Sequence, residues 1–294
     1  MKLSARFTAS LPYSSLEQTA KSHGWIQLSP FEWDDQHKTL RRCERVGRQL
    51  ATLVIRQKGN RTTCSCYSQS PLPESARHKL RQRFLYMIGH EIQLADFLSL
   101  AKRLDPQVHL FAQRGGARFL RGTTLFEDAA KTLFTTNASW SFTRQMCMRL
   151  TTACHRRVSP LPYGMPFPTA KQVAAMSVAV LEKDCRLGYR GAYLNNIARK
   201  FVECHSFADW DVDDILACLA KVKGVGEYSI NHLGMLLGKW DRIPVDSEVR
   251  SYVRQTGRSD DSDSIQAHYA HWHPYEFLAY KIERRLVHKA WIGN

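Results

Sequence analysis

The stretch from Asp211 to Gln255 reads DVDDILACLAKVKGVGEYSINHLGMLLGKWDRIPVDSEVRSYVRQ, and its spacing predicts two helices joined by a tight turn. Asp211 can cap a first helix through Ala220, since a short acidic side chain accepts the orphan amides of a helix start. That helix ends before the glycines at 224 and 226. From Glu227 the apolar residues recur at helical spacing, at Ile230, Leu233, Leu236 and Leu237. The pattern predicts helix, glycine turn, helix.

The turn itself suits an anion. Two glycines around one apolar residue let the backbone approach a phosphate closely, and the following helix presents unpaired amides and the positive end of its dipole. Such a hairpin would grip a nucleic-acid backbone without reading bases. A plain helical hairpin is the competing interpretation. The candidate DNA contacts here are Lys223, Gly224, Val225, Gly226 and Ser229.

An aspartate follows the second helix. Pro244 and Asp246 lie in the segment IPVDS, before another helical pattern, so Asp246 or Ser247 is expected at the cap. A cap with no further role is the simpler interpretation. A fixed negative charge beside DNA phosphates is costly, however, unless it stabilises a positive charge that appears during a reaction. Asp246 is therefore the candidate catalytic residue.

These residues resemble the helix-hairpin-helix base-excision DNA glycosylases, whose motif is a hairpin, a loop with glycine and proline, and then an aspartate. Gly224 to Gly226 match the hairpin, Gly238 and Pro244 the loop, and Asp246 the aspartate. The resemblance covers nearly the whole chain and is strongest over residues 166–256.

Three other segments carry the same resemblance. PFPT at 166–169 and LGYRGAYL at 187–194 look like the family's segment before the hairpin. TTNASW at 135–140 is similar to a helix start that places a wedge residue into the duplex, which makes Asn137 a candidate DNA contact. Residues 23–33 look like the amino-terminal sheet domain of the 3-methyladenine glycosylase II branch.

The resemblance implies an enzyme that flips a base out of double-stranded DNA and hydrolyses its N-glycosidic bond. Tyr228 and His232 lie four apart on one helix face and are candidates for the base pocket, as are Trp240 and Tyr275. Core packing is the competing interpretation for each. Arg250 is a candidate phosphate contact, as are Lys221 and Arg254.

Two departures from the family narrow the expected chemistry. Lyase-competent members carry a lysine two positions after the second hairpin glycine, where this chain has Tyr228, and no cysteine follows Cys218 to hold an iron–sulfur cluster. We therefore expect a monofunctional glycosylase without a lyase lysine and without a cofactor. A monovalent cation at the hairpin turn is compatible with this interpretation, and no other metal is expected.

Composition agrees with a DNA partner. The 294 residues hold 42 Lys and Arg against 27 Asp and Glu, a formal charge of +15. The longest apolar runs, such as residues 173–181, are far shorter than the ~20 residues of a membrane helix. The eight cysteines lie singly except for Cys64 and Cys66, which is typical of reduced thiols. We expect a soluble, non-exported monomer in the cytoplasm, associated with the nucleoid when bound to DNA, and no membrane partner.

The first half of the chain has a different pattern. Short β-rich runs at 6–11, 25–28, 49–55 and 61–67 alternate with helical patterns at 14–20 and 71–90, whereas residues after about 94 are mostly helical. The predicted fold class is α+β, with a small antiparallel sheet domain over 1–95 and a helical glycosylase domain over 96–294.

Several alternatives stay open. The branch resemblance favours alkylated purines and repair. A hypermodified pyrimidine of phage DNA, such as glucosylated hydroxymethylcytosine, would make the enzyme antiviral. The alternative to an enzyme is a non-catalytic protein that binds DNA damage.

Overall fold

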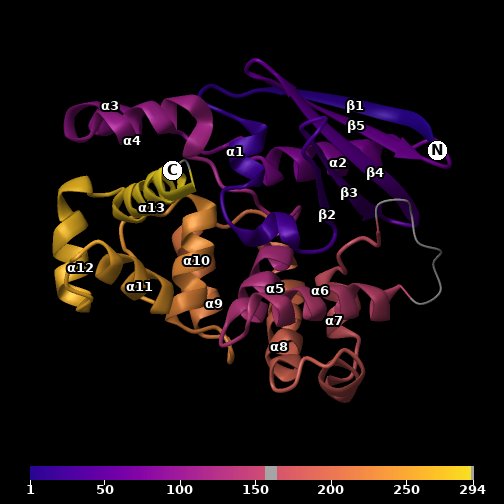
Figure 1. Cartoon of the computed structure of the whole chain (residues 1–294). Helices are drawn as coiled ribbons and strands as arrows, with labels where there is room; N and C mark the ends of the chain where they lie inside the picture. The colour runs from indigo at the N-terminus through magenta and orange to yellow at the C-terminus, as the bar shows by residue number, and fades with distance from the viewer. Residues whose placement is uncertain (156–163, 293–294) are drawn as a thin grey trace.

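The computed structural model describes residues 1–155 and 164–292, without the side chains of 288–292. Its first part is a five-stranded antiparallel sheet in the order β1-β5-β4-β3-β2 (Figure 1). The strands are β1 (Lys2–Ser10), β2 (Phe31–Asp34), β3 (Thr39–Val46), β4 (Gln49–Lys58) and β5 (Arg61–Ser68). Strands β2 to β5 follow one another as hairpins, and β1 adds to the free edge of β5. The predicted α+β class is confirmed.

The sheet differs from the expectation in three places, and one of them is strand β2, which lies in none of the predicted β-rich runs. Residues 25–28 belong to a 3₁₀ helix, η1 (Gly24–Gln27), and not to a strand. Trp25 and Leu28 are both fully buried, and a spacing of three puts them on one face of a helical turn but on opposite faces of a strand. Strand β3 was not predicted, because charged residues at buried positions, Arg42 and Glu44, hid its apolar alternation.

Two helices accompany the sheet. The short helix α1 (Leu16–Ala20) is capped by Ser15, whose hydroxyl accepts from the amide of Gln18 at 3.2 Å. Helix α2 (Glu74–Met87) packs on the sheet through Ala76, Leu80, Phe84 and Met87. Both helices lie where the sequence predicts them, with α2 shorter at each end.

The rest of the chain is helical, and Figure 1 shows it below and beside the sheet. The α-helices are α3 (Ala95–Leu104), α4 (Pro106–Phe111), α5 (Leu125–Thr135), α6 (Trp140–Cys154), α7 (Ala170–Ala174), α8 (Arg190–Glu203), α9 (Val212–Ala220), α10 (Glu227–Leu237), α11 (Ser247–Gln255), α12 (Ser262–Tyr269) and α13 (Glu276–Ile292). Short 3₁₀ or π turns are η2 (Ala112–Gly116), η3 (Val180–Asp184), η4 (His205–Phe207) and η5 (Ala270–Trp272). Helices α9 and α10 lie between the group α5–α8 and the group α11–α13.

A buried ionic cluster joins the sheet to α5. The guanidinium of Arg42 in β3 contacts Glu44 and Glu127, the latter at 2.9 Å, and Lys131 donates to Glu127 at 2.6 Å. Burial raises the pKa of Glu127, but Arg42 and Lys131 outweigh it and hold the pKa at about 2. The neighbouring Asp128 accepts from the indole Nε1 of Trp25 at 2.8 Å. Helix α5 therefore fixes both β3 and η1.

The end of the chain returns to its beginning. Arg285 of α13 donates to the carbonyls of Gly116 at 2.6 Å and Gln18 at 3.0 Å. Helix α13 therefore packs beside α1 and η2, which lie far from it in the sequence. The domain boundary at residue 95 stays a prediction. No helix in the described ranges is long and apolar enough to cross a lipid bilayer.

Candidate active site

The predicted hairpin is present. Asp211 caps α9, its carboxylate accepting from the amide of Asp214 at 2.9 Å, and α10 begins directly after Gly226. Gly224 has φ +102°, in the left-handed region that side chains avoid. A Cβ at this position would meet the ring of Tyr193 at 2.3 Å. The turn therefore requires glycine at position 224 for two independent reasons.

The start of α10 is open. Gly226 is the N-cap, no side chain satisfies the first amides, and a Cβ there would meet nothing within 4 Å. Lys221 and Lys223 are exposed beside the turn. Val225 packs against the core, and Ser229 is buried in the first turn of α10. The surface here suits an anion, because it combines the free amides and the positive dipole end of α10 with the two lysines.

Asp246, and not Ser247, is the N-cap of α11. Its Oδ1 accepts from the amide of Val249 at 2.8 Å, and the residue is half-buried. Helix α10 ends at Gly238 with φ +92°, and buried Pro244 leads the chain to the cap. One carboxylate oxygen is therefore fixed by the backbone, while Oδ2 makes no hydrogen bond among the described residues.

Tyr228 and His232 form a stack in α10, with ring centroids 5.9 Å apart. The phenol of Tyr228 lies 3.4 Å from the hydroxyl of Thr135 at the end of α5. Burial raises the pKa of Tyr228, and the carboxylate of Asp246 raises it further. Tyr228 and Asp246 are thus within electrostatic reach of each other.

His232 is the centre of a larger ring cluster. Only 8% of it is exposed, and its ring lies 5.0 Å from that of Trp25 and 5.9 Å from that of His23. Burial lowers the pKa of His232 to about 3, and the ammonium of Lys281 lowers it too, so the ring is neutral. Its Nε2 is buried and has no hydrogen-bond partner in the described part of the chain. We call Tyr228, His232, His23, Trp25 and Lys281 the ring cluster.

Sequence reasoning missed three members of the ring cluster. His23 and Trp25 come from the amino-terminal segment, and Lys281 is one of several charged residues in α13. The resemblance of residues 23–33 to a glycosylase branch was the only signal that this segment mattered. Nothing in the local spacing distinguishes Lys281 from its charged neighbours.

Two predicted pocket residues lie in another contact group. The indole Nε1 of Trp240 donates to the carbonyl of Met235 at 2.9 Å, and the ring stands 6.1 Å from that of Tyr275. Tyr275 in turn packs on Phe97 of α3 at 5.4 Å. Within the described residues, no ring contact joins this pair to Tyr228 or His232. A pocket role for Trp240 and Tyr275 stays a prediction.

The predicted arginine contacts are partly engaged inside the protein. Arg250 donates to the carbonyl of Asp260 and to the hydroxyl of Ser262, the latter at 3.1 Å, which ties α11 to the start of α12. Arg254 is more exposed and pairs with Asp260 at 3.1 Å. Arg250 therefore joins α11 to α12, and its contact with DNA stays a prediction.

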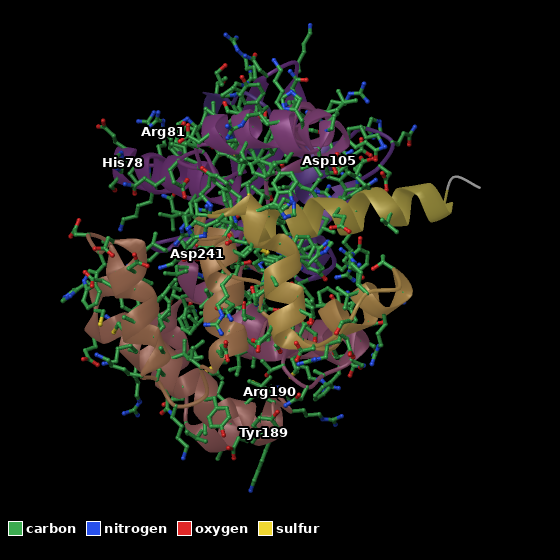
Figure 2. The ribbon with its side chains drawn as sticks, turned by 90° about the vertical axis from the view of Figure 1, so that its left-hand side faces the viewer. His78, Arg81, Asp105, Tyr189, Arg190 and Asp241 are labelled. Atoms are coloured by element: carbon green, nitrogen blue, oxygen red, sulfur yellow. The ribbon has the colours of Figure 1, made fainter. Side chains whose placement is uncertain are left out.

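Asn137 lies on an exposed turn in an unusual conformation. Its φ is +47°, and the carbonyls of Thr136 and Asn137 both accept from the buried guanidinium of Arg190. Figure 2 shows Arg190 beside Tyr189, whose ring centroid lies 4.6 Å from the guanidinium carbon and whose side chain is 52% exposed. Arg190, which we did not predict, thus fixes the turn that carries Asn137.

One cavity lies apart from these groups. A space of about 270 Å³ opens between α1 and the β4–β5 hairpin, lined by Ser14, Ser15, Leu16, Glu17, Lys38, Gln57 and Gly59. It shares no residue with the ring cluster or with Asp246. We assign no role to it.

No family model and no curated protein matches this sequence. Solved structures do match the fold. The apo 8-oxoguanine glycosylase/lyase of Clostridium acetobutylicum superposes with a TM-score of 0.68 at 13% identity, over 96% of this chain and 95% of that chain. The same protein with double-stranded DNA containing cytosine opposite 8-oxoguanine gives a TM-score of 0.67 at 12% identity, over 98% and 100%.

A second kind of glycosylase has the same fold. The 3-methyladenine DNA-glycosylase of Archaeoglobus fulgidus superposes with a TM-score of 0.69 at 16% identity, over 94% of this chain and 97% of that chain. At such identities the likeness concerns the fold. This chain therefore has the fold of solved DNA glycosylases over nearly its whole length.

Proposed function

We propose that this protein is a monofunctional DNA glycosylase, which hydrolyses the N-glycosidic bond of a damaged or modified base and leaves an abasic site. The observation that carries the proposal is the position of Asp246, fixed at the start of α11 with one oxygen free and within electrostatic reach of the ring cluster. The shared fold and the open start of α10 support DNA as the partner.

The chemistry follows from the groups present. Departure of a base leaves positive charge on the sugar, which a fixed carboxylate stabilises. The free oxygen of Asp246 could also orient the attacking water. Tyr228 occupies the hairpin position of the family's lysine, so the hairpin offers no amine to form a Schiff base. The proposal needs no cofactor, and a monovalent cation at the turn is a separate prediction.

Two classes of base are compatible with a ring-lined site. An alkylated purine would make the enzyme one of base-excision repair, and the fold shared with a 3-methyladenine DNA-glycosylase supports this class. A hypermodified pyrimidine of phage DNA would make it an antiviral enzyme. The unpartnered Nε2 of His232 supports a base that offers polar groups to the site.

The test is base release from a panel of methylated, deaminated, oxidised and phage genomic DNAs, read as alkali-sensitive strand cleavage. Asp246→Asn keeps an amide oxygen for the helix cap, so the fold and the DNA affinity should persist while release falls by about 10³-fold or more. Asp261→Asn is the matched control, because Asp261 caps the neighbouring α12 in the same way, accepting from the amide of Ser264 at 3.0 Å.

Each outcome is informative. Undiminished release by Asp246→Asn would refute the assignment of Asp246. Silence of the wild type across the panel, with tight binding to duplex DNA, would favour a non-catalytic damage-binding protein. A borohydride-trapped complex with the wild type would refute the monofunctional mechanism.

A further inference from the structure

Lys281 is held between the start of α11 and the amino-terminal segment. Three residues later, Arg284 pairs with Glu248 in the first turn of α11 at 2.8 Å. Four residues later, Arg285 donates to the carbonyl of Gln18 in α1 at 3.0 Å. Residues three and four apart share one helix face, so the face that carries Lys281 lies against both elements.

Lys281 is half-buried on α13. Its nearest aromatic neighbour is Phe277, with Nζ 5.1 Å from the ring centroid, and within the described residues it makes no hydrogen bond or ion pair. Burial lowers the pKa of Lys281 to about 8, as does Arg284, while Glu248 and Asp246 act in the opposite direction. At neutral pH most molecules therefore carry an unpaired cation here.

The groups whose charges interact with that of Lys281 come from four elements. They are Arg284 on α13 itself, Asp246 and Glu248 on α11, His232 on α10, and His23 before η1. Both histidines are kept neutral by burial, and Lys281 lowers the pKa of each. Among the residues that the structure describes, Nε2 of His232, which is 8% exposed, and Nε2 of His23 are buried polar atoms without a hydrogen-bond partner. Buried polar atoms are normally satisfied, so the Nε2 atoms of His232 and His23 point to a missing ligand.

The two classes of base differ in charge when they leave the sugar. An alkylated purine is cationic and departs neutral, whereas an uncharged base departs as an anion that must be stabilised or protonated. A cation beside the base would repel the first kind of substrate and assist the second.

We propose that Lys281 contacts the flipped base and donates to it as it leaves, and that the substrate is an uncharged base with oxygen or nitrogen acceptors. This inference rests on the proposed glycosylase function. The bond between C1′ and the base nitrogen breaks, its electron pair stays on the base, and the base takes a proton from the ammonium. Water adds to C1′, its proton passes to solvent through Asp246, and the Lys281 amine regains a proton from water.

The experiment measures base release by mass spectrometry in single turnovers. One duplex carries cationic 7-methylguanine, and a second set carries uncharged 8-oxoguanine, 5-hydroxymethylcytosine or its glucosylated form. We compare the wild type, Lys281→Met, Lys281→Arg and the control Lys79→Met, an exposed lysine on the outer face of α2. We expect uncharged bases to be released faster than 7-methylguanine, and Lys281→Met to lose about 10²-fold on the uncharged base only.

The pH profile separates proton donation from a structural role. For the wild type, release of the uncharged base should fall as the pH rises through about 8, because the neutral amine has no proton to give. Lys281→Arg should move this fall above the measured range, since the guanidinium stays charged. The Lys281→Arg variant also tests the inference if Lys281→Met does not fold.

Failure of the inference and failure of the proposed function look different. Faster release of 7-methylguanine, or unchanged rates in Lys281→Met, would overturn the role of Lys281 and leave the glycosylase proposal intact. An identical pH profile in Lys281→Arg would do the same. No release of any base by the wild type would refute the glycosylase function and, with it, the inference.

Discussion

The ring of Tyr193 occupies the space that a side chain at position 224 would need, 2.3 Å from the Cβ that Gly224 lacks. This contact, from α8 to the hairpin turn, sets the backbone that we propose meets DNA. We expect Gly224→Ala to cost about 2–4 kcal/mol of unfolding free energy, through overpacking and left-handed strain. It should also weaken duplex binding, measured by fluorescence anisotropy.

Gly226→Ala provides the contrast, since its new methyl group would meet open space and an extended backbone. Its stability should stay within about 1 kcal/mol of the wild type, while duplex binding falls because the methyl group stands where the phosphate would approach. Equal stability of the two variants would contradict the role of Tyr193.

The buried Glu127 predicts an acid-sensitive fold. Its carboxylate has a pKa of about 2 in the folded protein and an ordinary one, near 4.5, when unfolded. A lowered folded pKa stabilises the protein above pH ~4.5, and this contribution disappears as the pH falls from there toward 2. We expect Glu127→Gln to lose about 3–5 kcal/mol at pH 7, because Arg42 and Lys131 become uncompensated buried charges.

Urea unfolding of both proteins between pH 2 and pH 7 checks this expectation, and the two curves should converge at the acid end. The control is Glu32→Gln, which breaks a partly exposed pair with Arg41 at 3.3 Å and should cost less than about 1 kcal/mol. A difference between wild type and Glu127→Gln that is independent of pH would mean that the carboxylate charge is not the cause.

Salt dependence tests the phosphate contacts. Because bound cationic groups release counterions from DNA, the logarithm of the binding constant should fall linearly with the logarithm of salt concentration. Lys223→Ala should reduce that slope by about one, uniformly across sequences. Arg250→Ala should instead lower the stability, since it removes the bonds to Asp260 and Ser262. A flat salt response of the wild type would argue against a DNA clamp.

We expect substitution of Arg190 to slow base release without weakening DNA binding. Its guanidinium holds the carbonyls of Thr136 and Asn137, and thereby the turn in which Asn137 has a positive φ. Arg190→Met should slow base release by about tenfold or more, because a loosened wedge populates the flipped state less. Binding to undamaged duplex should change little. Arg144→Met, an exposed arginine on α6, is the control.

Local rules account for what the sequence predicted well. The hairpin, the cap at Asp246 and the pairing of Tyr228 with His232 follow from helical spacing and capping chemistry within one segment. Strand β3 escaped because Arg42 is paired across the molecule with Glu127, and no local pattern reveals a buried charge whose partner is 85 positions away. His23 and Lys281 escaped for the same reason, since only the tertiary fold brings them to His232.

The contact between Arg285 and Gln18 joins a late part of the chain to an early one, which matters during synthesis. A ribosome extends the chain by about 5–20 residues each second, beginning at the amino terminus. His23, Tyr228 and Asp246 are all translated before Lys281, which lies in α13. Every nascent chain therefore lacks the residue that completes the ring cluster until α13 has been synthesised. Base release as we propose it therefore requires synthesis through α13.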